Sequence, residues 1–87
     1  MVWWVYILRC GDGTLYTGVA TDVDRRFSEH RRGRGAKYTR AHGAEAVVYR
    51  ESCADKSAAL RREAAIKKLT RAQKLALLAG QDGDTLP

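Results

Sequence analysis

The stretch that decides the fold is VWWVYILRC (residues 2–10), followed by GDG (residues 11–13), Thr14 and LYTGV (residues 15–19). The first segment is rich in β-branched and aromatic residues. It is too continuously apolar for a half-exposed strand, so a central β-strand is predicted over residues 2–10. Gly11-Asp12-Gly13 is a strong turn signal, and residues 15–19 are expected to return as the hairpin partner. The chain is therefore predicted to begin with an antiparallel hairpin.

One helix and one further strand are predicted next. Thr21 can cap a helix that begins at Asp22, because a threonine hydroxyl accepts a free amide of the first turn. Val23 and Phe27 lie four residues apart and are expected to face the core. A short third strand is predicted over residues 46–51, which read Ala-Val-Val-Tyr-Arg-Glu.

Two helices are predicted to complete the domain. Asp55 or Ser57 opens the first, which runs to about residue 69 with an inner stripe of Leu60, Ala64 and either Leu69 or Lys67. Thr70-Arg71-Ala72-Gln73 is a capping box, so a separate short helix should extend to about Ala79. The expected fold is α+β, a three-stranded, mainly antiparallel sheet flanked by helices in the order ββαβαα. Residues 1–80 form the domain and residues 81–87 a flexible tail.

Composition and charge narrow the function. The 87 residues, 45% of them hydrophobic, suffice for one small domain with a modest core. A net charge of +6 favours a polyanionic partner. No apolar stretch approaches the roughly 20 residues needed to span a bilayer, and the first residues lack the features of a secretory signal. Two cysteines without metal-ligand spacing are expected to be reduced and buried, which favours an intracellular protein.

The chain contains several residue types that enzymes use to cleave phosphodiester bonds. Arg26 and His30 are four residues apart and share one helix face, whereas Tyr6 and Tyr16 stand on the predicted hairpin. Glu63 lies on a later helix. Each also has an ordinary structural explanation. Strand tyrosines usually pack in cores, Arg26 can be a surface arginine, and a helical glutamate pairs readily with a lysine four residues on.

The combination is more specific than its parts. Its motifs are Val5-Tyr6-Ile7, Tyr16-Thr17-Gly18-Val19, Asp22 to Arg26 with His30, Gly35-Ala36-Lys37-Tyr38-Thr39, and Glu63 in an Arg-Glu-x-x-Ile-Lys context. Over about residues 2–79 this pattern resembles the GIY-YIG nuclease superfamily, most closely its small stand-alone bacterial members. Three positions depart from relatives: Trp4 replaces the first glycine, Val19 a lysine, and Leu75 an asparagine found in other branches.

The resemblance implies roles for the candidate catalytic residues. Arg26 would hold the phosphate, since a guanidinium forks onto two phosphate oxygens and stays charged. Tyr6 would orient water or phosphate, and the base is either Tyr16 or His30. Glu63 would hold a single Mg²⁺ or Mn²⁺ ion, completed by waters and substrate.

The binding surface is predicted from a cationic run. Residues 31–40 carry five basic side chains and no acid, which predicts a mobile loop. Together with a basic pair after Glu63, the expected nucleic-acid-binding residues are Arg31, Arg32, Arg34, Lys37, Tyr38, Arg40, Lys67 and Lys68. Tyr38 and Tyr49 are candidates for base stacking.

The expected function is therefore a metal-dependent DNA endonuclease. By the resemblance, it would act on single-stranded or branched DNA in repair or recombination, in the bacterial cytoplasm at the nucleoid. The alternatives are an inactive nucleic-acid-binding module, an adaptor of a repair complex, or a small structural protein. The choice between DNA and RNA, the oligomeric state and the protein partners stay open.

Overall fold

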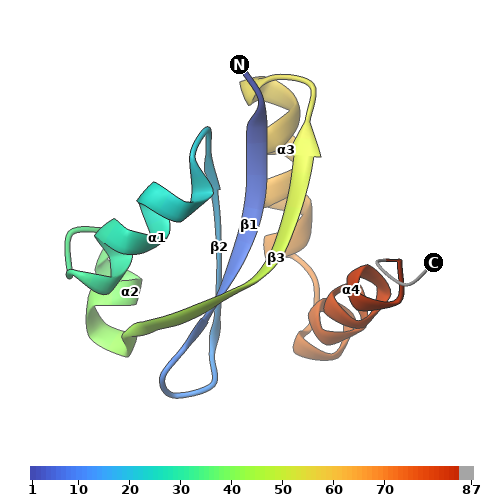
Figure 1. The fold of residues 1–87 in the computed structure, drawn as a ribbon. Coiled ribbons are helices and arrows are strands. Elements are labelled where there is room, and N and C mark those ends of the chain that lie inside the picture. The colour runs from blue at the N-terminus through green and yellow to red at the C-terminus, as the bar shows by residue number, and fades with distance from the viewer. Residues whose placement is uncertain (85–87) are drawn as a thin grey trace.

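The computed structural model describes the backbone of residues 1–84 and the side chains of residues 1–80. Its elements follow in the order β1 (Trp3–Cys10), β2 (Leu15–Ala20), α1 (Val23–Arg31), α2 (Lys37–His42), β3 (Ala44–Cys53), α3 (Lys56–Lys67) and α4 (Arg71–Asp84). The sheet has the order β2-β1-β3, with both pairings antiparallel. The α+β fold and the central position of β1 are confirmed (Figure 1).

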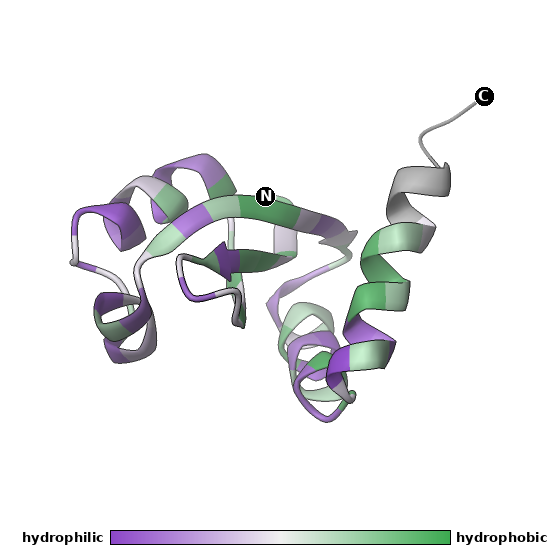
Figure 2. Ribbon diagram, turned by 90° about the horizontal axis from the view of Figure 1, so that it is seen from below, coloured by the Kyte–Doolittle hydropathy of each residue, from purple (hydrophilic) through white to green (hydrophobic). Residues whose placement is uncertain are grey.

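Both faces of the sheet are covered, which explains the continuous apolar run in β1. Val5 packs with Ile66 of α3 on one face. Tyr6 packs with Val23 of α1 on the other face, as expected from the alternation of side chains along a strand. Figures 1 and 2 show α1 and α2 on one side of the sheet and α3 and α4 on the other. Figure 2 also shows the more hydrophilic colouring of the α1–α2 side.

Strand β3 is longer than predicted. It pairs along all of β1, from Trp3 opposite Cys53 to Cys10 opposite Ala44, whereas the prediction covered only residues 46–51. Pairing with a central strand supplies backbone hydrogen bonds that local sequence does not reveal.

Two predictions around α1 and α2 are wrong. Asp22, and not Thr21, caps α1, because its carboxylate accepts the Arg25 amide at 3.0 Å. The mobile loop predicted over residues 31–40 contains the start of α2. That helix is held against the hairpin turn, where the Gly11 amide donates to the Gly43 carbonyl at 2.8 Å.

The inner stripe predicted for α3 is also wrong. Ala59 and Ile66 are buried, whereas Leu60 is 42% exposed and Ala64 is exposed. The reason is contact with the sheet, because Ala59 and Ile66 pack with Val5 and Ile7 of β1. Arg62, on the same side of the helix, bonds the carboxylate of Glu51 on β3.

The capping box of α4 is confirmed. The Thr70 amide donates to Gln73 Oε1 at 2.9 Å, and the Gln73 amide donates to Thr70 Oγ1 at 3.1 Å. The helix continues to Asp84, beyond the predicted end at Ala79. Flexibility of the tail 81–87 stays a prediction, since residues 85–87 lie outside the described part of the chain.

Both cysteines are free, Cys10 buried and Cys53 half-buried. None of the described helices combines the length and apolar character that crossing a bilayer requires.

Candidate active site

Tyr6 stands at the centre of the candidate site. Its side chain is 1% exposed, and its hydroxyl oxygen lies 3.0 Å from His30 Nε2. The ring covers Gly18, its partner on β2, so closely that a Cβ atom on Gly18 would lie 2.6 Å from the hydroxyl oxygen. The glycine of the Tyr16-Thr17-Gly18 motif is therefore required by the approach of the phenol.

The hydrogen bonds around His30 assign its tautomer. Its Nδ1 lies 2.6 Å from the Thr39 hydroxyl oxygen, and that hydroxyl donates its only proton to the Ala36 carbonyl at 2.9 Å. Thr39 must then accept from the His30 Nδ1–H group, which leaves Nε2 bare to accept the Tyr6 proton. Burial, reinforced by the charge of Arg26, lowers the pKa of His30. The imidazole is thus a neutral acceptor aimed at Tyr6.

Gly35 completes the cage around the imidazole. A Cβ atom there would lie 2.1 Å from His30 Nδ1, a separation that no side chain tolerates. Gly18, Gly35 and Thr39 were missed as site residues, although all three lie in motif segments. The signal was present, but a role in packing or hydrogen bonding shows only when the chain is folded.

Arg26 approaches Tyr6 from α1. Its side chain is 37% exposed, and Nη1 lies 3.1 Å from Glu29 Oε1. The hydrogen bond to Glu29 raises the pKa of Arg26, so the guanidinium is a permanent cation. Burial, with Tyr16 and Glu63, raises the pKa of Tyr6 to about 12, although the charge of Arg26 acts in the opposite direction. Tyr6 is therefore a neutral phenol at neutral pH.

Glu63 approaches from α3, on the other side of the sheet. Its side chain is 19% exposed and pairs with Lys67, whose Nζ lies 3.4 Å from Glu63 Oε2. Its charge is the smallest of the contributions to the raised pKa of Tyr6, after burial and Tyr16. No cluster of three or more metal-ligating side chains occurs in the described part of the chain. A lone carboxylate fits Mg²⁺, which keeps several waters and takes few protein ligands.

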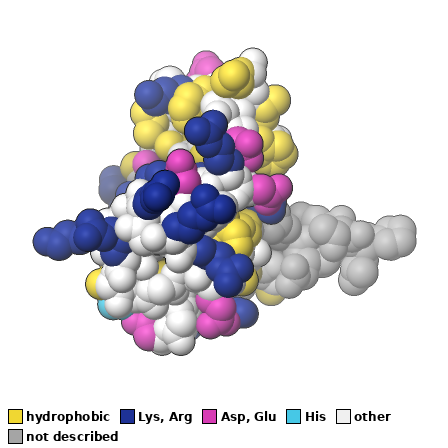
Figure 3. Space-filling model, turned by 60° about the vertical axis from the view of Figure 1, so that its left-hand side comes forward, with side chains coloured by type: hydrophobic (Ala, Val, Ile, Leu, Met, Phe, Trp, Pro, Cys, Tyr) yellow, Lys and Arg dark blue, Asp and Glu magenta, His cyan; other side chains and the backbone are white. Residues whose placement is uncertain are grey.

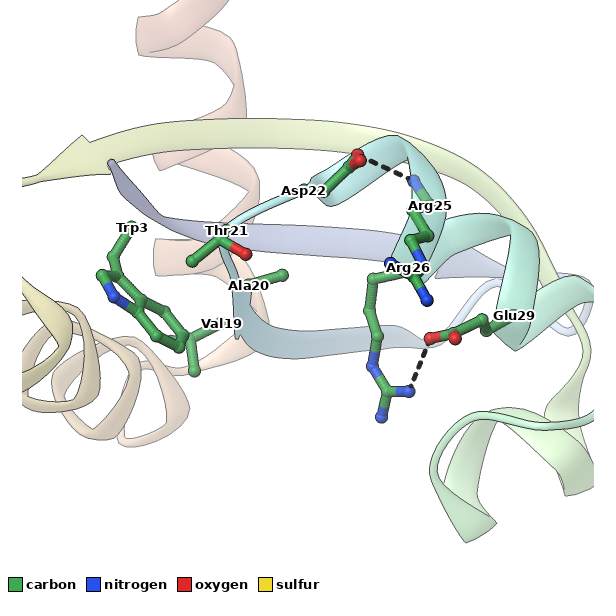
Figure 4. Close-up of a pocket in the computed structure, with 8 residues that line it drawn as sticks. All are labelled: Trp3, Val19, Ala20, Thr21, Asp22, Arg25, Arg26 and Glu29. Atoms are coloured by element: carbon green, nitrogen blue, oxygen red, sulfur yellow. Dashed lines mark hydrogen bonds and ion pairs between the residues drawn. The ribbon is translucent and has the colours of Figure 1, made fainter. Parts of the chain in front are cut away.

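The candidate site borders the edge strand β2 on the α1 side, and none of the described residues that line the hollow there belongs to α3. A hollow of about 300 Å³ lies beside the end of β2, and Arg26 forms one wall. Figure 4 shows the lining residues, which are Trp3, Val19, Ala20, Thr21, Asp22, Arg25, Arg26 and Glu29. Residues from both faces of the sheet thus border one space.

An aromatic row leads from the buried imidazole to the surface. The centroids of the Tyr16 and His30 rings are 5.2 Å apart, and the Tyr38 ring stacks on Tyr16 with 5.9 Å between their centroids. His42 follows at 4.3 Å from Tyr38 and forms an ion-pair contact with Asp12 in the hairpin turn. Tyr38 is 38% exposed and remains available to a base.

Tyr49, unlike Tyr38, is not accessible to a base. It is 7% exposed, and its hydroxyl donates to Glu51, which Arg62 also binds. Base stacking by Tyr49 is therefore a wrong prediction, because the pairing of β3 with β1 places this ring in the core.

The predicted basic residues all lie at the surface. Those in the 31–40 segment are exposed, as are the two lysines after Glu63. Arg31 is held over the Phe27 ring, with 5.8 Å between the guanidinium carbon and the ring centroid. Figure 3, which brings the α1–α2 side forward, shows lysine and arginine side chains spread over this face.

Comparison with known proteins gives concordant matches. The GIY-YIG catalytic domain family matches residues 2–76. A UPF0213 protein of Halobacterium salinarum is 55% identical over 73 residues, covering 84% of this chain and 95% of the relative. A UPF0213 protein of Cronobacter sakazakii is 48% identical over 79 residues, covering 91% and 83%.

Two solution NMR structures are also similar. The UPF0213 protein of Bacillus halodurans aligns with a TM-score of 0.58 at 46% identity, covering 91% of this chain and 84% of that one. A protein of E. faecalis aligns with a TM-score of 0.61 at 36% identity, covering 93% and 88%. GIY-YIG domains form a nuclease superfamily whose members generally act on nucleic acids with divalent metals. The chain belongs to the GIY-YIG catalytic domain family.

Proposed function

We propose that the protein is a metal-dependent endonuclease that hydrolyses phosphodiester bonds in DNA. The observation that carries the proposal is the environment of the Tyr6 oxygen. It donates to a neutral His30, and the charges of Arg26 and Glu63 both act on it. A phenol that can pass its proton to a histidine, with an arginine nearby to bind a phosphate, is suited to take a proton from a water molecule that attacks that phosphate.

The tautomer of His30 suggests the proton route. The Tyr6 oxygen accepts a proton from the attacking water while its own proton passes to His30 Nε2, so no free phenolate forms. The water oxygen bonds to phosphorus, the ester P–O bond breaks, and the leaving oxygen takes a proton from solvent. His30 acts through Tyr6 in this scheme, because its Nε2 lies 3.0 Å from the Tyr6 hydroxyl oxygen. Tyr16 remains the alternative first acceptor.

Arg26 is proposed to bind the phosphate oxygens. A planar guanidinium matches a phosphate with two parallel hydrogen bonds and stays charged. Glu29 now bonds Nη1, so a phosphate must share or replace that contact.

Glu63 is proposed to hold one Mg²⁺ or Mn²⁺ ion. Its carboxylate would first have to leave the ion pair with Lys67. A bound divalent ion stabilises charge on the phosphate and favours ionisation of water. The exposed basic residues and Tyr38 would hold the strand, and single-stranded or branched DNA of repair or recombination is the proposed substrate.

A binding module without catalysis is the second candidate. It is favoured by the ion pairs Arg26–Glu29 and Lys67–Glu63, which engage both key charges. This form would bind DNA and leave it intact.

The test is cleavage of labelled single-stranded, duplex and branched DNA with Mg²⁺, Mn²⁺ or EDTA. Metal-dependent products should disappear in Arg26→Ala and Glu63→Gln and persist in Arg9→Ala, a control whose guanidinium pairs with Glu45 on another part of the surface. Undiminished cleavage in EDTA or in both variants would contradict the proposal. Binding without products would establish the second candidate.

A further inference from the structure

The hollow beside Arg26 has a second wall that the proposed chemistry does not use. Trp3 lies opposite Arg26, with Val19, Ala20 and Thr21 between them (Figure 4). The volume of about 300 Å³ is at the small end of the range for ligand pockets. One opening thus exposes part of an indole and a guanidinium together.

The indole is held in place from two directions. Trp3 is half-buried and packs against the apolar cluster that contains Val5 and Ile66. The Lys56 ammonium, from the first turn of α3, lies over the ring at 5.4 Å from its centroid. A fixed aromatic plate loses little conformational freedom when a ligand packs on it.

The charges of the hollow limit what can occupy it. Arg25 and Arg26 can attract one phosphate, but the carboxylates of Asp22 and Glu29 also line the space and disfavour a second. A ligand with one phosphate and an uncharged aromatic part can place the phosphate on Arg26 and the aromatic part against Trp3.

We propose that this hollow is a nucleobase subsite, in which the base next to the phosphate on Arg26 packs against Trp3. The inference rests on the proposed function and adds a specificity residue to it. A base stacked in a duplex cannot lie against Trp3, so the subsite selects a nucleotide that is unpaired beside the cleaved bond.

The test uses binding without cleavage. Trp4→Phe leaves Trp3 as the only tryptophan of the chain. Deoxyadenosine 5′-monophosphate and 2-deoxyribose 5-phosphate carry the same phosphate and differ in the base. In EDTA at low salt, the nucleotide should quench Trp3 fluorescence and bind at least about fivefold tighter, the lower end expected for one base stack.

Variants of Trp3 locate the preference. Binding of the two probes to each variant can be followed by the NMR shifts of α1 amides. The preference for the nucleotide should be lost in Trp3→Leu and partly kept in Trp3→Phe, which retains an aromatic ring. An unchanged amide spectrum away from residue 3 verifies folding. Absence of quenching, equal binding of the two probes, or an unchanged preference in Trp3→Leu overturns the subsite.

The two proposals can fail separately. If the nucleotide quenches Trp3 but no DNA is cleaved, the subsite stands and the endonuclease proposal falls. If DNA is cleaved through Arg26 and Glu63 but the probes bind equally, the endonuclease stands and the subsite falls.

Discussion

Tyr6 is the residue on which the contacts of the site converge. Its hydroxyl meets His30 on one side, its ring rests on Gly18, and Arg26 and Glu63 act on its pKa from different helices. Any buried tyrosine needs a hydrogen-bond partner for its hydroxyl, so the bond to His30 alone does not distinguish a catalytic role from a structural one. The functional role is therefore testable by removing a single oxygen atom.

Tyr6→Phe is expected to affect stability and activity together. The substitution leaves the buried Nε2 of His30 without a donor, which should cost about 1–3 kcal/mol in the free energy of unfolding. Loss of the proton route should lower the cleavage rate by about 10²–10⁴-fold. Urea unfolding and single-turnover cleavage measure the two effects. Tyr38→Phe is the control, because its ring is 38% exposed and the substitution should change stability little. Full cleavage by Tyr6→Phe would remove Tyr6 from the mechanism.

Glu29→Gln tests whether Glu29 restrains Arg26. The pair is more than one-third exposed, so its loss should change stability by only about 0–1 kcal/mol. Binding of DNA in EDTA should tighten, because one negative charge beside the phosphate site is removed. Glu45→Gln is a matched control, since Glu45 pairs with Arg9 at similar exposure on another part of the surface. Equal effects of the two substitutions on affinity would show that Glu29 has no special position.

At the scale of elements, α2 links the hairpin turn to the imidazole. Thr39 on this helix holds His30, while His42 at its end contacts Asp12. Hydrogen bonds from Thr14, with a further contribution from His42, lower the pKa of Asp12 to about 2. The turn between β1 and β2 therefore takes part in positioning a side chain of the site.

Asp12→Asn should loosen α2. Loss of the charged partner of His42 is expected to speed amide hydrogen exchange in α2 more than in α1, and to lower the cleavage rate because Thr39 holds His30 less firmly. Asp24→Asn is the comparison, since Asp24 pairs with Arg50 away from this helix. Unchanged exchange in α2 would show that the backbone bonds from Gly11 suffice to dock it.

Local sequence predicted the elements that local signals specify. The hairpin and the capping box of α4 follow from turn and cap chemistry, and both are present. Helix α2 was missed because tertiary contacts hold a short polar segment, in which Thr39 bonds His30 and His42 contacts Asp12. The inner face of α3 was misjudged because packing against Val5 and Ile7 of β1, and not the periodicity of the helix, decides that Ala59 and Ile66 are buried. Propensity cannot anticipate either effect.

The candidate site residues were proposed from the sequence, but their arrangement was not. The functional roles of Arg26, His30 and Glu63 were inferred from the family resemblance. Taken alone, each residue also had an ordinary structural explanation. The bond from Tyr6 to His30 and the tautomer set by Thr39 depend on distances between elements. The proposed route through Tyr6 therefore could not be predicted from the sequence.

For the whole molecule, burial of neutral His30 predicts a pH dependence of stability. Its pKa in the folded state is lowered, while an unfolded histidine titrates near about 6.5. Below that pH the unfolded state binds the proton first, so stability is fully present above about pH 6.5 and is lost progressively as the pH falls from there toward the lower pKa of the folded state. Asp12 contributes only at lower pH, below its ordinary value of 3.8.

Urea unfolding from about pH 8 down to about pH 5 measures this dependence. The free energy of unfolding should fall with pH, and His30→Gln should flatten that part of the profile because no proton is taken up at residue 30. An identical slope in the variant, or a gain in stability on acidification, would show that His30 is not buried as a neutral base.

The central claim is that Glu63 holds a divalent ion within reach of Tyr6 and Arg26. Titration of the isotope-labelled protein with Mn²⁺ measures this most directly, because the paramagnetic ion broadens NMR signals according to distance. We expect broadening first at Glu63, Tyr6 and Arg26, and loss of this pattern in Glu63→Gln but not in Glu45→Gln. Broadening elsewhere on the surface, or the same pattern in Glu63→Gln, would contradict the account.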